Sequence, residues 1–232
     1  MSVWKSVGTG IWIRVYSFGG NPINTSVVDM GDGGLMAISP GTDVGDADFA
    51  ALDELGTVKA LVVPGAFHNM GLPVWFARYP DAEIYGPADC IAHVAKQHKD
   101  IPAVQPLNAL AAKLPDGCEL EEVAGMKYAD LFLAIKQDDG TTWFTNEIVT
   151  NNEAYPGNFM FKLAFQLTGS GPGLNVNKLA MMLVRGKKAQ IRSYLEGKLD
   201  SVPPTRLVPT HGIVLDDANL ADQMREMFAR RL

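Results

Sequence analysis

The stretch from Val58 to Leu72, VKALVVPGAFHNMGL, places the strongest constraint on how this chain folds. It begins as a short, largely apolar run, which predicts a buried strand over Val58–Val63. Pro64 and Gly65 then break the strand, and His68 follows in a loop just before a predicted helix. In open α/β sheets, ligands and reactive groups lie in loops beyond the carboxyl ends of the strands. The stretch therefore predicts a sheet with a histidine at its functional edge.

The residues before this stretch predict antiparallel strands followed by a helix. Ile11–Ser17 predicts a first strand, and Asn24–Met30 and Leu35–Ile38 predict a hairpin. The residues between the hairpin strands, Gly31–Gly34, tolerate the positive φ angles of a tight turn. Asp46–Leu55 has apolar residues at helical spacing and acidic residues at its start, so we expect a helix there.

Strand and helix patterns then alternate. Leu72–Arg78 predicts a short helix that tolerates Pro73 in its first turn. Ala82–Tyr85 predicts a strand, and Pro87 starts a helix that runs to about Lys99. This order is typical of a parallel part of a sheet.

The second half of the chain again combines a predicted hairpin with predicted helices. Ala129–Ile135 and Thr142–Thr145 predict another hairpin, and the polar residues from Glu147 to Tyr155 predict a long loop. Gly157–Thr168 is nearly all apolar, which favours a buried helix, with a hydrophobic lid or a dimer surface as the alternative. Further strands are predicted at Ala103–Leu107, Glu119–Val123 and Thr205–Val208. Further helices are predicted at Asn177–Val184 and Lys187–Leu199, and a last one carries the apolar stripe Leu220, Met224, Met227 and Phe228.

Two hairpin-rich halves, each completed by helices, predict a mixed α/β (α+β) fold, a four-layer αβ/βα sandwich. The same pattern is compatible with a simpler three-layer α/β fold. Nothing in the sequence resembles a linker or a repeat, so we expect a single domain over residues 1–232.

Composition narrows the class of protein. The net charge of -6 argues against nucleic acid or an anionic membrane as the main partner, because both require a basic face. Cys90 and Cys118 have no metal-site spacing and do not form a disulfide framework. The sequence shows no signal peptide and no apolar run long enough to span a membrane, so a cytoplasmic protein is expected.

Three polar residues follow predicted strands and are the candidates for chemistry: His68, Glu147 and His211. If these strand ends meet at one edge, two imidazoles and a carboxylate converge, which is a donor set that holds zinc or ferrous iron. Each residue also has a simpler interpretation as a hydrogen-bonded or solvated loop residue. His93 and His98 lie five positions apart on a predicted helix, so they do not share a face, and we expect both at the surface or the helix end.

Several phrases, in this order, resemble the metallo-β-lactamase-fold superfamily over most of the chain. Residues 22–28 (PINTSVV) and 33–41 (GGLMAISPG) are similar to its opening hairpin. The family's Thr-His-x-His-x-Asp-His-x-x-Gly signature would fall on Val62–Gly71. Phe144–Glu147 resembles the family's Phe-x-Gly-Asp phrase, and Thr210–Gly212 resembles its closing Gly-His-Gly.

The resemblance implies a reduced ligand set. Val63, Gly65 and Phe67 occupy signature positions that hold metal ligands in the family, and the family's later histidine is replaced in the segment Ala124–Lys127. The first metal site of the family would then be lost. The second would keep His68, Glu147 and His211, with Phe67 in place of an aspartate.

Three functions are compatible with these residues. The first is a mononuclear metal-dependent hydrolase of unknown substrate, with one zinc or iron ion held by His68, Glu147 and His211. The second is a catalytically inactive protein of this fold, without metal, that acts as a binding or interaction module. The third is a non-haem iron oxidoreductase, because the donor types match a facial triad. In each case we expect a nearly apolar pocket around Phe67, Trp143 and Phe159, a small-molecule ligand or substrate, and a homodimer if the apolar helix is exposed.

Overall fold

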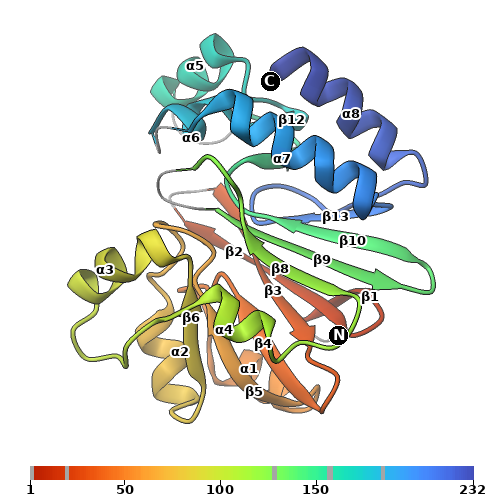
Figure 1. Cartoon of the computed structure of the whole chain (residues 1–232). Helices are drawn as coiled ribbons and strands as arrows, with labels where there is room; N and C mark the ends of the chain where they lie inside the picture. Colours follow the sequence, from red (N-terminus) through yellow and green to blue (C-terminus); the bar gives the residue numbers. More distant parts are fainter. Residues whose placement is uncertain (1–2, 19–20, 127–129, 156–158, 184–185) are drawn as a thin grey trace.

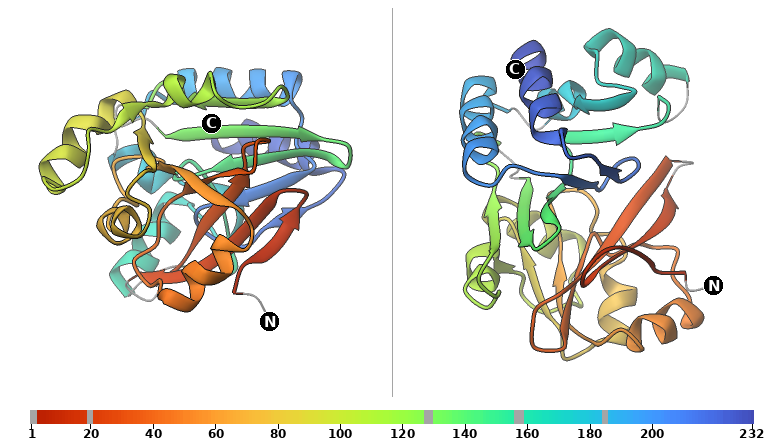
Figure 2. Two further views of the ribbon diagram at one scale, coloured as in Figure 1. Left: turned by 90° about the horizontal axis from the view of Figure 1, so that it is seen from below. Right: turned by 90° about the vertical axis from the view of Figure 1, so that its right-hand side faces the viewer.

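Two β-sheets lie face to face with helices on their outer sides, which gives four layers (Figures 1 and 2). The structure is a computed structural model, and it describes residues 3–18, 21–126, 130–155, 159–183 and 186–232. The predicted four-layer sandwich is therefore confirmed in place of the three-layer alternative. The predicted positions Lys127, Ala129, Gly157 and Val184 lie outside the described residues.

The first sheet has the strand order β1-β2-β3-β4-β5-β6-β7. Its first four strands are antiparallel neighbours, and β4 to β7 run parallel, as the alternation of strands and helices predicts. The strands are β1 (Lys5–Gly8), β2 (Ile11–Phe18), β3 (Asn21–Asp29), β4 (Gly34–Ile38), β5 (Thr57–Val62), β6 (Glu83–Gly86) and β7 (Gln105–Pro106).

The second sheet has the strand order β14-β13-β10-β9-β8. The predicted hairpin is present as the antiparallel pair β9 and β10, and β10 also pairs with β13 in parallel. A separate antiparallel pair, β11 and β12, lies beyond the end of this sheet (Figure 1). The strands are β8 (Cys118–Glu122), β9 (Leu131–Gln137), β10 (Gly140–Thr145), β11 (Val149–Asn152), β12 (Gly173–Val176), β13 (Arg206–Pro209) and β14 (Leu215–Asp216).

The helices cover the outer faces of the sheets and leave the inner faces to pack together. In Figure 1 the helices α1 (Asp46–Asp53), α2 (Leu72–Arg78) and α3 (Ala88–Gln97) lie outside the first sheet. On the other side, α7 (Lys188–Ser201) and α8 (Leu220–Arg231) lie outside the second sheet.

Strand β9 shows why this arrangement suits the sequence. Leu131, Leu133 and Ile135 pack in the core between the two sheets, whereas Phe132 and Ala134 pack in the core beneath α7 and α8. Because both faces of the strand are buried, its side chains are continuously apolar instead of alternating with polar ones. A third core lies between the first sheet and α1 to α3, and Trp75 is one of its fully buried members.

Several short elements differ from the sequence predictions. The strands β1, β12 and β14 are not predicted by any pattern. The strand predicted over Ala103–Leu107 is only two residues long, and α4 (Leu107–Ala111) follows it. The predicted loop from Glu147 to Tyr155 contains β11, whose polar residues are buried because they pair with β12. The sequence of β11, VTNN, lacks the apolar pattern of a buried strand, so its structure follows from the pairing with β12.

The apolar helix is the clearest correction. A helix forms at α5 (Phe159–Thr168), but the prediction that it is buried is wrong, because none of its residues is buried. It packs against the short helix α6 (Lys178–Leu183) at one end of the sandwich (Figure 1), which leaves Phe159 and Leu167 more than three-quarters exposed. The alternative, a lid or a dimer surface, stays a prediction. In the described part of the chain, no helix has the length and apolar character needed to cross a membrane.

Candidate metal centre

The three candidate residues stand directly after the carboxyl ends of three strands. His68 follows β5, Glu147 follows β10, and His211 follows β13. Because β10 and β13 are parallel neighbours, with Thr145 opposite Pro209, their ends lie side by side. The pairing continues past the strands, since the Thr210 N–H donates to the carbonyl oxygen of Thr145 at 2.8 Å. The parallel pair therefore holds Glu147 and His211 at the same edge.

Strand β3 of the first sheet forms hydrogen bonds with the loop that carries His211. The side-chain amide of Asn24, a buried residue of β3, donates to the carbonyl oxygens of Pro209 at 2.7 Å and Gly212 at 2.8 Å. The backbone N–H of Asn24 donates to Thr210 at 2.9 Å. These three hydrogen bonds fix the loop that carries His211 between the two sheets.

The backbone of His68 adopts a conformation that few side-chain-bearing residues tolerate. Its φ angle is +59°, in the left-handed region, which costs about 1–3 kcal/mol for a residue other than glycine. Its loop also approaches other backbone closely, because a Cβ on Gly71 would lie 2.2 Å from the carbonyl oxygen of Pro40. Strain of this kind persists where surrounding structure enforces it, and it concentrates at functional sites.

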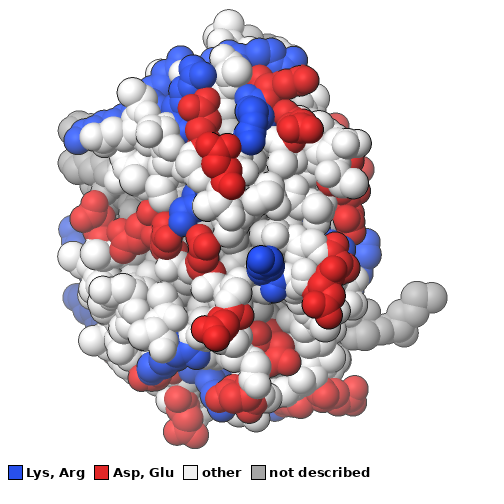
Figure 3. Space-filling model, turned by 45° about the vertical axis from the view of Figure 1, so that its right-hand side comes forward, with Lys and Arg blue, Asp and Glu red and all other residues white. Residues whose placement is uncertain are grey.

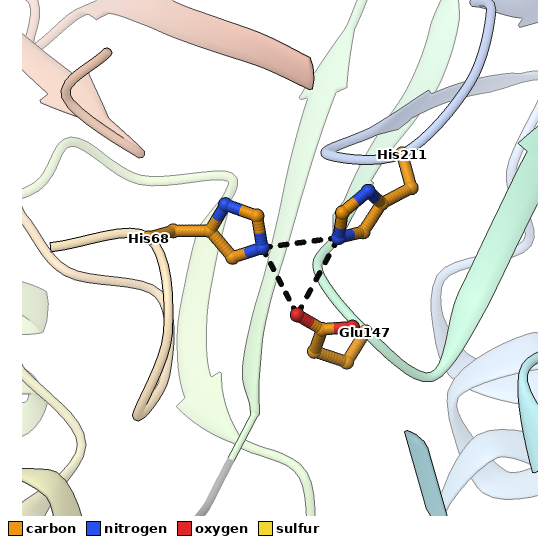
Figure 4. A group of neighbouring side chains, drawn as sticks. All are labelled: His68, Glu147 and His211. Carbon is orange, nitrogen blue, oxygen red and sulfur yellow. Dashed lines mark hydrogen bonds and ion pairs between the residues drawn. The ribbon is translucent and has the colours of Figure 1, made fainter. Parts of the chain in front are cut away.

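These loops bring the three donor atoms together, and the side chains point toward one another (Figure 4). The Nε2 atom of His68 lies 2.9 Å from Oε1 of Glu147 and 3.0 Å from Nε2 of His211. The Nε2 atom of His211 lies 3.4 Å from the same carboxylate oxygen. Within the described residues this is the group of histidine, cysteine and acidic side chains with metal-holding geometry.

Burial and charge set the protonation of the three groups. Burial lowers the pKa of His68, although the hydrogen bond with Glu147 opposes this effect. Burial alone would raise the pKa of Glu147, but the charge of His211 and the hydrogen bonds from both imidazoles outweigh it and lower that pKa. The pKa of His211 is raised because the attraction of Glu147 exceeds the effect of burial. The carboxylate of Glu147 and the neutral form of His68 can bind a cation directly, whereas His211 must first lose the proton that Glu147 stabilises.

A second carboxyl group, that of Asp130, forms hydrogen bonds with the backbone at Glu147. It accepts hydrogen bonds from the backbone N–H groups of Glu147, at 2.9 Å, and Ile148, at 2.8 Å. Burial and the negative charge of Glu147 raise the pKa of Asp130 to about 7, against the effect of these donors. Asp130 therefore fixes the backbone that carries Glu147 rather than adding a fourth donor atom.

The distances test whether a metal ion fits. Zinc bonds to histidine nitrogen and carboxylate oxygen are about 2.0–2.2 Å long, which places tetrahedral ligand atoms about 3.4 Å apart. The observed separations of 2.9, 3.0 and 3.4 Å approach this spacing, so small side-chain movements would seat an ion. Two imidazoles and one carboxylate also match the donor preference of zinc and ferrous iron, and three protein ligands leave positions for water or substrate. The residues present fit such an ion.

A cavity of about 650 Å³ opens onto the three side chains. Phe67 lines it and is half exposed, as predicted for the apolar pocket. The other two residues predicted to line the pocket, Trp143 and Phe159, do not line it. Trp143 is fully buried beneath α7 and α8, and Phe159 points into solvent. Helix α5 instead contributes Phe161 and Phe165 to the lining.

Sequence patterns single out the three donors but not the residues that hold them in place. Asn24 lies in a predicted strand, within the phrase PINTSVV, and Asp130 lies at the edge of an apolar run, but no pattern assigns either residue a role at the site. The only available signal was a polar residue inside a segment predicted to be buried, which requires a hydrogen-bonding partner. His93 and His98 lie outside the site as predicted, with His98 at the end of α3 and bonded to Asn69 at 2.9 Å.

The fold and the position of the site at strand ends define the chain as a protein of the metallo-β-lactamase fold. A metallo-β-lactamase from Erythrobacter litoralis has a TM-score of 0.65 and 14% identity, with 98% of this chain and 96% of that chain covered. The metallo-β-lactamase FIM-1 from Pseudomonas aeruginosa, in its mono-zinc form, has a TM-score of 0.59 and 11% identity, with 98% and 94% covered. The Flv1 flavodiiron core from Synechocystis has a TM-score of 0.62 and 14% identity, with 98% and 60% covered. No protein-family model and no curated protein matches the sequence.

Proposed function

We propose that the protein is a mononuclear metal-dependent hydrolase in which His68, Glu147 and His211 hold one zinc or iron ion. The observation that carries this proposal is the convergence of three donor atoms within 4.8 Å of one another at the mouth of a cavity. The mono-zinc form of FIM-1 supports it, because that protein of the same fold is described with a single zinc ion.

The ion would supply Lewis acidity, which lowers the pKa of a water molecule and polarises a substrate carbonyl. The chain's own residues set the geometry. Asp130 fixes the backbone N–H of Glu147, and Asn24 fixes the loop of His211, so two donors are held by groups that do not touch the ion. Partners of this kind orient ligands and typically change metal affinity by a factor of about 10–100. Phe67 places an apolar side chain in the wall of the cavity that opens onto the ligands.

The second candidate function, a metal-free binding module, is favoured by one specific observation. The Glu147 carboxylate already lies at hydrogen-bonding distance from Nε2 of His68, so it has a partner without an ion. The cavity would then bind a small molecule that is not transformed. An iron oxidoreductase would use the same three ligands, and the identity of the bound metal separates it from a zinc hydrolase.

Metal analysis of protein purified without a histidine tag tests the proposal. We expect about one equivalent of zinc or iron in the wild type and its loss in the His68→Ala and His211→Ala variants. His93→Ala on α3 is the matched control and should retain the metal, because His93 lies outside the cluster. The proposal is contradicted if the metal content is substoichiometric and does not change in the His68→Ala and His211→Ala variants. That result favours the metal-free binding module.

A further inference from the structure

The cavity beside the three donor residues has the size of a small-molecule site. Its volume of about 650 Å³ falls within the 300–1,000 Å³ that is typical of ligand pockets. Helices α5 and α6 and the short segment between β12 and α6 form one wall, with Phe161, Phe165, Leu179 and Leu183. Ala66, Phe67 and Met70, from the loop that carries His68, also line it.

Apart from His68, Glu147 and His211, the described lining carries no charged side chain. None of the described residues that line the cavity is lysine or arginine, and Glu147 is its only acidic residue. On the face of the molecule in Figure 3, by contrast, acidic side chains are spread widely and basic side chains concentrate along the upper edge. A carboxylate or phosphate placed away from the donor atoms would lose its hydration without gaining a cationic partner, which is costly. The cavity therefore disfavours an anionic tail.

The amides at the cavity wall are largely engaged by the protein itself. The side chain of Asn69 donates to Gln97 at 2.9 Å and to the carbonyl oxygen of Ala66 at 3.1 Å, and its oxygen lies 2.9 Å from Nε2 of His98. The side-chain oxygen of Asn177 accepts the N–H of Ala180 at 3.0 Å. A ligand that lies along this wall finds mainly carbon atoms to contact.

We propose that the cavity binds a neutral alkyl or acyl chain, with the carbonyl end of the molecule directed at His68, Glu147 and His211. The orientation of the carbonyl rests on the proposed hydrolase function, whereas the binding of the chain does not require a metal. The substrate class is thus a neutral, long-chain ester or amide. Selection comes from burial of methylene groups against the wall formed by α5 and α6.

Binding to metal-free protein tests the proposal independently of catalysis. Butanamide, hexanamide and octanamide are titrated into chelator-treated protein, and each displaces the neutral fluorophore Nile red. We expect affinity to rise about fourfold per methylene group, because burial of each group is worth about 0.8 kcal/mol. Suberic acid monoamide matches octanamide in length but ends in a carboxylate, and we expect it to bind at least tenfold more weakly. Equal affinity across the series, or for the matched pair, overturns the proposal.

Two variants of α5 test whether the amides bind in the cavity. Phe165→Asp introduces a carboxylate into the cavity wall and should weaken octanamide binding at least tenfold. Leu167→Asp is the control on the same helix, because this side chain is 79% exposed and lies outside the lining. Circular dichroism is used to check that both variants are folded, and Phe161→Asp serves as a second cavity variant if Phe165→Asp does not fold. Equal binding by the cavity and control variants contradicts the proposal.

The two proposals fail separately. Chain-length-dependent binding without stoichiometric metal supports the alkyl site and refutes the hydrolase. One equivalent of metal without chain-length dependence supports the metal centre and refutes the alkyl site.

Discussion

The Nε2 atoms of His68 and His211 lie 3.0 Å apart, although 143 residues separate them in the sequence. One histidine follows a strand of the first sheet and the other follows a strand of the second sheet. The site is therefore a junction between the two sheets, and its geometry depends on the contacts that hold the sheets together.

Asn24→Ala should weaken the contact between the two sheets while leaving the three metal-binding side chains in place. The substitution leaves the carbonyl oxygens of Pro209 and Gly212 without their buried partner, which costs about 1–3 kcal/mol of unfolding free energy. Metal affinity should fall roughly tenfold or more, because His211 loses its support. Chemical denaturation and metal titration measure the two effects. Asn108→Ala, at an exposed position of α4, should change neither quantity, and equal behaviour of the two variants would refute the role of Asn24.

Gly212→Ala should displace the His211 loop directly. Gly212 has a φ angle of +105°, and a Cβ there would lie 2.0 Å from the carbonyl oxygen of Asn151. The strain and the steric clash together should cost roughly 2 kcal/mol or more and weaken metal binding. Gly173→Ala has a similar positive φ but no atom within 4 Å of the added Cβ, so it should cost only about 1 kcal/mol. Comparable losses of stability and metal affinity in both variants would show that the close approach is irrelevant.

Asp130→Asn should weaken the support of Glu147. Oδ2 of Asp130 accepts from the N–H groups of both Glu147 and Ile148, and Oδ1 lies 3.1 Å from the nitrogen of Glu147, so the NH₂ group of an asparagine would face a backbone N–H in either orientation. We expect a stability loss of about 1–3 kcal/mol and metal affinity reduced roughly tenfold. Asp81→Asn, at an exposed position, is the control for the change of charge. Unchanged metal affinity in Asp130→Asn would remove Asp130 from the supporting structure.

In metal-free protein the two histidines should titrate on opposite sides of the ordinary value of 6.5, His68 below it and His211 above it. By linkage, His211 contributes stability below pH 6.5 that is lost as the pH rises through its folded pKa. His68 has the opposite sign, since its neutral form is favoured and stability falls as the pH drops below 6.5. Because the two contributions oppose each other, titration of individual imidazole resonances by NMR is the better measurement.

Glu147→Gln provides the control for that titration. Removal of the carboxylate charge should lower the pKa of His211, because the attraction of Glu147 is what raises it. An unchanged pKa of His211 in this variant would show that the charge pair does not form.

The apolar and polar patterns predicted most of the layers and strand ends, but not the shortest elements. Strand β9 is predicted because both of its faces are buried, and α2 because Pro73 fits a first helical turn. Strand β11 is missed because its sequence, VTNN, lacks the apolar pattern of a buried strand, and helix α4 because its five residues are too few to show a helical period. Helix α5 is predicted as a helix but wrongly as buried, because apolar composition does not reveal whether a partner covers it.

Sequence patterns predicted a mixed α/β fold, the alternation of its elements and the three candidate ligands in loops after strands, but they left a three-layer arrangement open. The structure was needed to show that these ligands meet, that Asn24 and Asp130 support them, and that Phe161 and Phe165 face the cavity while Trp143 does not. Periodicity reports burial only along one segment of chain. Distances between segments depend on strand order and on the packing of one sheet against the other, which are set by many side chains together.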